Sequence, residues 1–197
     1  MDNIGFENAA SFTARHGAKF SQRSKAEDGA PLRLDWLDTA MGPMLAICDA
    51  SHLYMLEFTD RKAMLRQFEK LHKTRRRAIA LGRTKITDQI ETELEAYFAG
   101  QLPQFETPMM PTGTDFQRAT WRQLCNIPHG QTRSYTQLAD MVGNPKAVRA
   151  VASANARNGL ALIIPCHRVI GRDGGLGGYA GGVSKKAELL TIEGVIR

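Results

Sequence analysis

Residues 136–154 read Thr136-Gln-Leu-Ala-Asp-Met-Val-Gly-Asn-Pro-Lys-Ala-Val-Arg-Ala-Val-Ala-Ser-Ala154. Apolar side chains recur at helical spacing from Thr136 to Val142, and an alanine-rich helix is predicted over Lys146 to Ala154. Gly143-Asn-Pro145 fits a tight turn between them, because glycine tolerates positive φ and proline is favoured in the first turn of a helix. This order is typical of a helix-turn-helix motif. A packed helical hairpin without a ligand would show the same pattern.

The second of these helices is poorly equipped to read a base sequence. Its first half is mostly small residues, which let a backbone approach DNA closely but offer few donors or acceptors to base edges. Arg149 is a long cation among alanines and suits a gap left by an extruded base. The formal net charge of +6 also favours an anionic partner. We therefore expect DNA contacts from Ser134, Asn144, Ala147, Val148, Arg149 and Ala150.

The N-terminal half has short apolar runs separated by turn residues. These runs predict three strands, at Leu32–Leu37, Met44–Cys48 and Leu53–Phe58. Apolar residues at helical spacing predict helices over Arg61–His72 and Thr87–Phe98. We expect a small α/β domain in which these helices accompany an antiparallel sheet.

Prolines mark a boundary between two domains. Three prolines and a glycine fall between Leu102 and Thr114, a composition typical of a linker. Beyond it, helices are predicted over Phe116–Cys125 and Ser184–Glu193. We predict a flexible tail at residues 1–30, the α/β domain at residues 31–108, and a mainly α-helical domain with the helix-turn-helix at residues 113–197.

Composition narrows the class of protein. No apolar run approaches the roughly 20 residues of a membrane span, and the N-terminus lacks the apolar stretch of a secretory signal. The three cysteines, Cys48, Cys125 and Cys166, are odd in number and form no Cys-x-x-Cys pair, which argues against a disulfide framework or a thiolate zinc cluster. We expect a cytoplasmic protein that does not associate with membranes.

A candidate nucleophile follows the apolar run Leu160–Ile164, which is predicted to be a buried strand or extended segment. The next residues are Pro165-Cys-His-Arg-Val169. Positive charge lowers the pKa of a neighbouring cysteine, and the thiolate is the reactive form. By themselves these residues are more commonly a structural cysteine beside a chance histidine.

Two later features favour the reactive alternative. Gly174 to Gly182 contains six glycines around Tyr179, which implies a loop packed closely against something, and a flat ligand would fit. Glu193, at the end of the last predicted helix, is a carboxylate that could orient a histidine.

Together, these residues resemble the family of O6-alkylguanine-DNA alkyltransferases, also called methylated-DNA–protein-cysteine methyltransferases. The resemblance rests on Pro165–Val169, the helix-turn-helix with Arg149, Tyr135, Asn158 and the Tyr179 loop, and it runs in order from about Phe116 to Gly194. It implies direct-reversal DNA repair: one alkyl group passes from O6-alkylguanine, and also from O4-alkylthymine, to Cys166. The expected partner is double-stranded DNA carrying the damaged base.

The resemblance also assigns catalytic roles. Cys166 accepts the alkyl group, and His167 deprotonates it through a bound water. Glu193 holds His167. Asn158 braces the turn that carries the active-site strand, and Tyr135 protonates the guanine ring as it leaves.

Further roles concern the substrate. Arg149 takes the place of the flipped nucleotide. The backbone of Cys166 and Val169 reads the exocyclic amine of guanine, and the loop at Tyr179 and Ala180 closes the pocket.

The resemblance implies no organic cofactor and a protein that acts as a monomer, with possible cooperative assembly on DNA. Some relatives carry zinc in their N-terminal domain. Here that half offers Cys48, His16, His52 and His72 at unsuitable spacing, so we predict no metal.

Two other functions fit parts of the sequence. A cysteine hydrolase could use Cys166, His167 and Glu193, but it would give no reason for the helix-turn-helix. A DNA-binding regulator without catalysis would explain the helix-turn-helix, but its alanine-rich second helix suits sequence-specific binding poorly.

Overall fold

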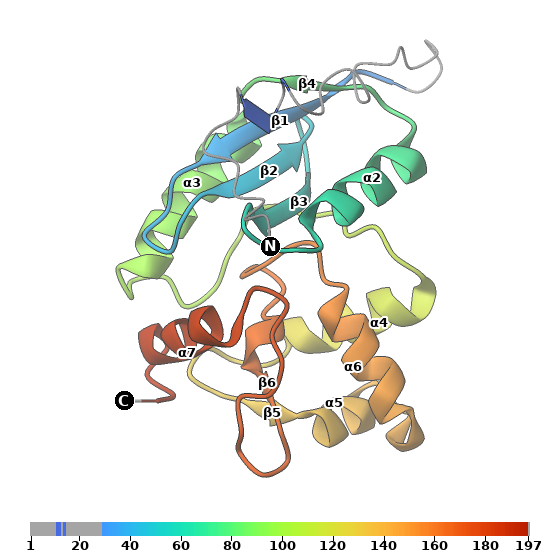
Figure 1. The fold of residues 1–197 in the computed structure, drawn as a ribbon, viewed down its shortest axis with the longest axis vertical. Helices are drawn as coiled ribbons and strands as arrows, with labels where there is room; N and C mark the ends of the chain where they lie inside the picture. The colour runs from blue at the N-terminus through green and yellow to red at the C-terminus, as the bar shows by residue number, and fades with distance from the viewer. Residues whose placement is uncertain (1–10, 13, 15–28, 197) are drawn as a thin grey trace.

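The computed structural model describes residues 11, 12, 14 and 29–196 (Figure 1). Most of the tail predicted at residues 1–30 therefore lies outside the described residues. Phe12 is buried and stacks edge-on against Phe68, with ring centroids 5.3 Å apart. None of the described helices has the length and apolar character that a membrane span requires.

A four-stranded sheet forms the upper part of the molecule in Figure 1. Its order is β3-β2-β1-β4, with β1 at Leu32–Leu37, β2 at Met44–Cys48, β3 at Leu53–Phe58 and β4 at Ile79–Leu81. The first three strands have the predicted bounds and pair antiparallel. The predicted antiparallel sheet has a fourth strand in addition, and the sheet is mixed because β4 pairs parallel with β1. Three residues are too few for a recognisable strand pattern, so β4 was not predicted.

Helices cover both faces of this sheet. Every residue of β2 and β3 is buried, which is expected of strands enclosed on both sides. The helix α2 (Met64–Arg75) packs on one face, and α3 (Lys85–Phe98) packs on the other. The start of α3 lies two residues before the predicted one because Thr84 caps it, accepting hydrogen bonds from the backbone of Ile86 and Thr87.

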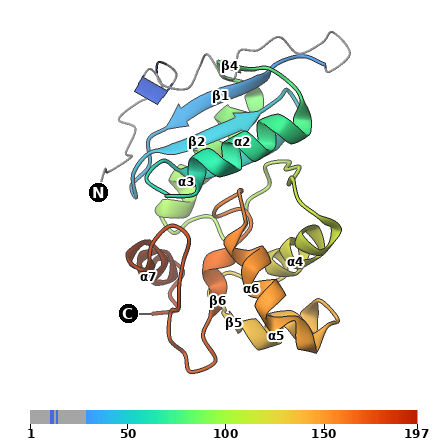
Figure 2. The ribbon, with the colours of Figure 1, turned by 45° about the vertical axis from the view of Figure 1, so that its right-hand side comes forward.

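The C-terminal part is mainly helical and lies below the sheet in Figures 1 and 2. Its elements are α4 (Asp115–Cys125), β5 (Arg133–Ser134), α5 (Tyr135–Met141), the 3-10 turn η2 (Pro145–Ala147), α6 (Val148–Ala156), the 3-10 turn η3 (Cys166–Arg168), β6 (Val169–Ile170) and α7 (Val183–Ile192). The predicted helix-turn-helix corresponds to α5, η2 and α6. Its turn contains Gly143 at φ +79°, a conformation that residues with a Cβ rarely adopt.

The predicted burial of Leu160–Ile164 is confirmed, but the prediction of a strand or extended segment there is wrong. Only Leu160 pairs with another strand residue, in an isolated bridge to Leu56. The chain then turns, because Leu162 has φ +71° and the Ile164 amide bonds back to the Leu160 carbonyl at 3.0 Å. An apolar run predicts burial here but not this turn.

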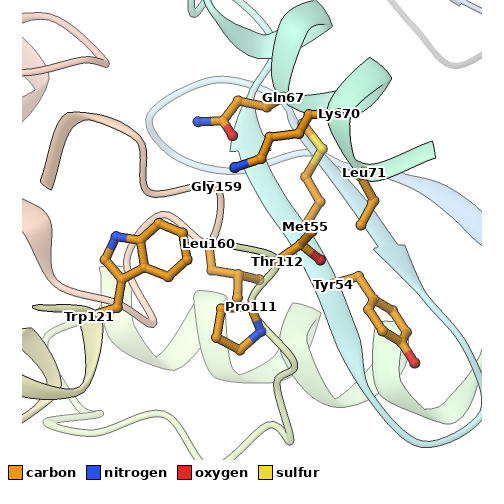
Figure 3. A pocket seen from close by; sticks show the side chains of 10 residues that line it. All are labelled: Tyr54, Met55, Gln67, Lys70, Leu71, Pro111, Thr112, Trp121, Gly159 and Leu160. Carbon is orange, nitrogen blue, oxygen red and sulfur yellow. The ribbon is translucent and has the colours of Figure 1, made fainter. Parts of the chain in front are cut away.

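The two parts of the molecule meet along this turn. The amide of Leu56 donates to the Gly159 carbonyl at 2.9 Å, and the amide of Ala161 donates to the Leu56 carbonyl at 2.8 Å. In Figure 3, Gln67 and Lys70 project from α2 toward Gly159 and Trp121. One apolar core continues from α3 through the junction to Cys166.

Candidate active site

Cys166 is the first residue of η3 and is only 6% exposed. Its backbone is held on both sides: the amide donates to the Ile164 carbonyl at 2.7 Å, and the carbonyl accepts from the Asn155 side chain at 3.3 Å. The side-chain amide of Asn158 points at the sulfur, with Nδ2 and Sγ 3.2 Å apart. This contact places a hydrogen-bond donor directly against the sulfur of Cys166.

Asn158 connects the sulfur to the turn that precedes it. Its Nδ2 also donates to the carbonyls of Ile164 (2.8 Å) and Leu160 (3.2 Å), and its Oδ1 accepts from the Leu160 amide at 2.9 Å. The residue is 1% exposed. One side chain thus links both ends of the segment from Leu160 to Ile164 and the nucleophile itself.

His167, the residue after Cys166, forms a buried pair with Glu193. The imidazole Nε2 lies 2.8 Å from Oε1 of Glu193, and neither side chain is accessible to solvent. Burial lowers the pKa of His167, so the imidazole is neutral at neutral pH. A carboxylate that accepts from Nε2–H leaves the lone pair on Nδ1, which has no hydrogen-bond partner among the described residues. His167 can therefore act as a base through Nδ1.

Glu193 has further side-chain partners in Arg168 and Tyr97, and the Gly130 amide also donates to it at 3.4 Å. Arg168 donates to it through Nε (2.8 Å to Oε2) and Nη2 (2.9 Å to Oε1), and Tyr97 donates through its hydroxyl (2.8 Å to Oε1). Hydrogen bonds from His167 and Arg168 outweigh the effect of burial and hold the pKa of Glu193 well below its usual value. The carboxylate is therefore ionised throughout the neutral range. Arg168 belongs to the quoted motif, whereas Tyr97 lies within the helix predicted over Thr87–Phe98, where nothing in the sequence marks its hydroxyl as important.

Two tyrosines flank the thiol. Tyr135, half-buried at the start of α5, has its pKa raised by burial and by the neighbouring Cys166. Burial and Cys166 also raise the pKa of Tyr179 well above its usual value. Both phenols are therefore protonated at neutral pH, and either can donate a proton or a hydrogen bond. The neighbouring Ala180 is exposed on the glycine-rich loop.

Lys186 fixes the start of that loop from α7. It is fully buried, and its amine donates to the carbonyls of Val169 and Leu176. Val169, predicted to contact guanine, is likewise fully buried, and it directly follows η3. The sequence pattern gave no reason to single out this lysine among the charged residues of the helix.

An ion pair from the N-terminal part contacts the backbone just before the turn at Leu160–Ile164. Arg61 and Glu57 are both buried and bonded to each other. Arg61 also donates to the carbonyls of Asn158 and Ala156, each at 2.7 Å. Arg61 had been predicted only as the first residue of a helix, and nothing local indicated its contacts about a hundred residues further along the chain.

The residues predicted to contact DNA lie on and beside α6. Asn144, Arg149 and Ala150 are exposed, and Ala147 and Val148 are half-buried. Ser134 is half-buried and caps α5, accepting from the Gln137 amide at 3.2 Å. Figure 2 shows α5 and the start of α6 at the end of the molecule away from the sheet, whereas the end of α6 reaches toward the N-terminal part.

In the part of the chain that the structure describes, no group of three or more His, Cys, Asp or Glu side chains is arranged to hold a metal ion. Of the residues considered for zinc, Cys48 is buried, with its sulfur 3.1 Å from the Thr84 hydroxyl. His16 lies outside the described residues.

Known proteins share both the sequence and the fold of this chain. The family described as 6-O-methylguanine DNA methyltransferase, DNA binding domain, matches residues 115–195. A methylated-DNA–protein-cysteine methyltransferase of Methanosarcina barkeri is 51% identical over 109 residues, or 55% of this chain and 69% of that protein. The protein of the same name from Mycobacterium bovis is 52% identical over 101 residues, covering 51% of this chain and 61% of its own length.

Solved structures extend the similarity to the N-terminal part. Mycobacterium tuberculosis OGT in complex with DNA superimposes with a TM-score of 0.70 and 37% identity, covering 82% of this chain and 92% of that one. The O6-methylguanine-DNA methyltransferase of Pyrococcus kodakaraensis, at 24% identity, shares the fold with a TM-score of 0.62 over 83% of this chain and 99% of that one. The predicted combination of an α/β part and a helical part with a helix-turn-helix is confirmed. The exact domain limits remain predictions.

Proposed function

This chain belongs to the family of methylated-DNA–protein-cysteine methyltransferases, and we propose that it repairs DNA by moving the alkyl group of O6-alkylguanine onto the sulfur of its own Cys166. DNA is its partner. The observation that carries the proposal is the buried pair of a neutral imidazole and an ionised carboxylate whose histidine directly follows Cys166, a thiol that faces the side-chain amide of Asn158.

The reaction is a displacement at carbon. His167 takes the thiol proton, the thiolate attacks the alkyl carbon, an S–C bond forms, and the bond from that carbon to O6 breaks. The departing guanine carries the negative charge, and Tyr135, which is protonated at neutral pH, supplies the proton that neutralises it. The product is a thioether, which water does not hydrolyse, so each protein molecule reacts once.

Access to the base requires its removal from the duplex, since Cys166 is nearly buried. The exposed Arg149 at the start of α6 would occupy the space left in the base stack, while phosphate contacts from the basic protein supply affinity. Tyr179 and the backbone of Cys166 and Val169 would enclose the flipped guanine. Action on O4-alkylthymine, a monomeric state, cooperative assembly on DNA and a cytoplasmic location stay predictions.

The proposal is tested by intact-mass measurement after incubation with duplex DNA containing O6-methylguanine. We expect the protein to gain the mass of one methylene, mapped to the peptide that holds Cys166, and to stop there. Cys166→Ala should gain nothing while its DNA affinity stays close to that of the unaltered protein.

Cys125→Ala is the matched control, because it removes a second thiol, which is exposed at the end of α4. This variant should react like the unaltered protein. Transfer to another residue, or release of many product molecules per protein, would contradict the proposal.

A further inference from the structure

The hydroxyl of Tyr97 reaches the centre of the active site from the N-terminal part. Tyr97 lies near the end of α3 and is 1% exposed. Its oxygen is 2.8 Å from Oε1 of Glu193 and 3.5 Å from Nε2 of His167. The same carboxylate oxygen is also the partner of the imidazole, so two donors from different parts of the molecule share one acceptor atom.

The ring of Tyr97 is held where it is by packing and not by this hydrogen bond alone. It lies against Phe105 and Phe98, with centroids 5.2 Å and 5.5 Å away, and belongs to the apolar core that extends to Cys166. The hydroxyl is therefore presented to Glu193 in a fixed position.

We propose that Tyr97 is a positioning residue for alkyl transfer, whose hydroxyl shares Oε1 of Glu193 with His167 and so sets the orientation and basicity of the imidazole that removes the Cys166 proton. This inference rests on the proposed function and adds a fourth member, supplied by the other half of the chain, to the set Cys166, His167 and Glu193.

The physical argument concerns how strongly Glu193 attracts the proton of the imidazole. Each donor to a carboxylate offsets part of its negative charge and lowers its strength as an acceptor for the others. Burial, followed by the charge of Glu193, raises the pKa of Tyr97, so its hydroxyl stays a donor across the neutral range. Without that hydroxyl, Glu193 would stabilise the protonated imidazole more strongly, and the pKa of His167 would rise.

Other charged or titratable groups around the pair set the background for this effect. Arg168 donates to both oxygens of Glu193, and the buried Lys186 and Arg168 both disfavour a positive charge on His167. His129 stacks edge-on against Tyr97, with ring centroids 6.4 Å apart. A change at the Tyr97 hydroxyl leaves all of these groups in place.

The test is Tyr97→Phe in the full chain, with the rate of Cys166 alkylation by O6-methylguanine free base followed as a function of pH. The free base takes DNA binding and base flipping out of the measurement. We expect the acid limb of the profile to move upward by about one pH unit, the amount that one hydrogen bond of ordinary strength to a charged group would produce. NMR titration of the His167 ring should show the same upward shift.

Tyr54→Phe is the matched control. It makes the same chemical change in a tyrosine on the opposite face of the sheet, whose hydroxyl donates to Asp49 at 2.7 Å. Its pH profile should equal that of the unaltered protein. For Tyr97→Phe, an unmoved profile, or a rate lowered equally at every pH with no change in the His167 titration, would overturn the inference. If the unaltered protein does not accept the alkyl group, the proposed function fails instead.

Discussion

Removal of the Arg61 guanidinium should destabilise the protein severely. In Arg61→Met, the carboxylate of Glu57 would stay buried without its cation. Among the described residues, the donor that remains to it is the backbone amide of Phe58, at 3.2 Å. Stranding one partner of a buried ion pair typically costs about 3–5 kcal/mol. Since small proteins are stable by only about 5–15 kcal/mol, this is a large share of the total.

The lost contacts to the active-site turn contribute less to this loss. The Asn158 carbonyl would keep its hydrogen bond from Gln67 at 3.1 Å, and Ala156 is exposed, so water can reach its carbonyl. The charge left on Glu57 should therefore dominate. In Glu57→Gln the charge left unpaired is that of Arg61, which keeps its hydrogen bonds to two carbonyls. The free energy of unfolding should therefore fall less than in Arg61→Met.

Urea unfolding of the two single variants and of the double variant Glu57→Gln/Arg61→Met measures this cycle. The double variant should recover most of the stability that Arg61→Met loses, because no buried charge remains. Lys185→Met, which breaks the more exposed pair with Asp60, is the control and should cost less than about 1 kcal/mol. A double variant as unstable as Arg61→Met would refute the argument from charge and assign the loss to the carbonyl contacts.

Two further predictions concern the DNA surface and the buried histidine. Arg149→Ala should slow repair of duplex DNA far more than reaction with the free base, because the role proposed for the exposed Arg149 is to fill the base stack and not to assist the sulfur; equal losses in the two rate assays would show that it does not assist flipping. Burial lowers the pKa of His167 from its ordinary 6.5, so below this pH the unfolded chain binds a proton that the folded protein does not. The free energy of unfolding should therefore fall as the pH decreases through 6.5, and urea titrations of His167→Gln should show a flatter dependence; an unchanged slope would mean that another group is responsible.

Local patterns were sufficient to predict most elements of the fold. The bounds of β1, β2 and β3 follow from runs of apolar residues, and the helices follow from their 3.6-residue period. The segment Leu160–Ile164 shows where such patterns fail. Its apolar side chains are all buried, as predicted. The path of its backbone depends on hydrogen bonds from the Asn158 side chain and on pairing with Leu56, and neither can be inferred from the five residues of the run.

The site divides in the same way. Cys166, His167 and Glu193 could be proposed because they fall in a recognisable order within one half of the chain, and the structure brings the side chains of His167 and Glu193 together. Tyr97 could not be proposed, because the helical pattern at its position requires only an apolar ring. Its hydroxyl donates to Glu193, which lies 96 residues further along the chain. Arg61 was equally unpredictable, since an arginine at the start of a helix is usually solvated.

The N-terminal part is therefore best regarded as one wall of the active site. Leu56 pairs with the backbone on either side of Leu160, Arg61 bonds the carbonyls of the turn at Asn158, and Tyr97 bonds Glu193. Leu56 belongs to β3, Arg61 to the segment that follows β3, and Tyr97 to α3. Three separate elements of the N-terminal part thus contact the residues around Cys166. Each ends on a polar group with a defined direction, which apolar packing alone could not replace. The positions of Asn158 and Glu193 relative to Cys166 thus depend on how the two parts are joined, so a change in the sheet can alter the chemistry of a thiol that the sheet does not carry.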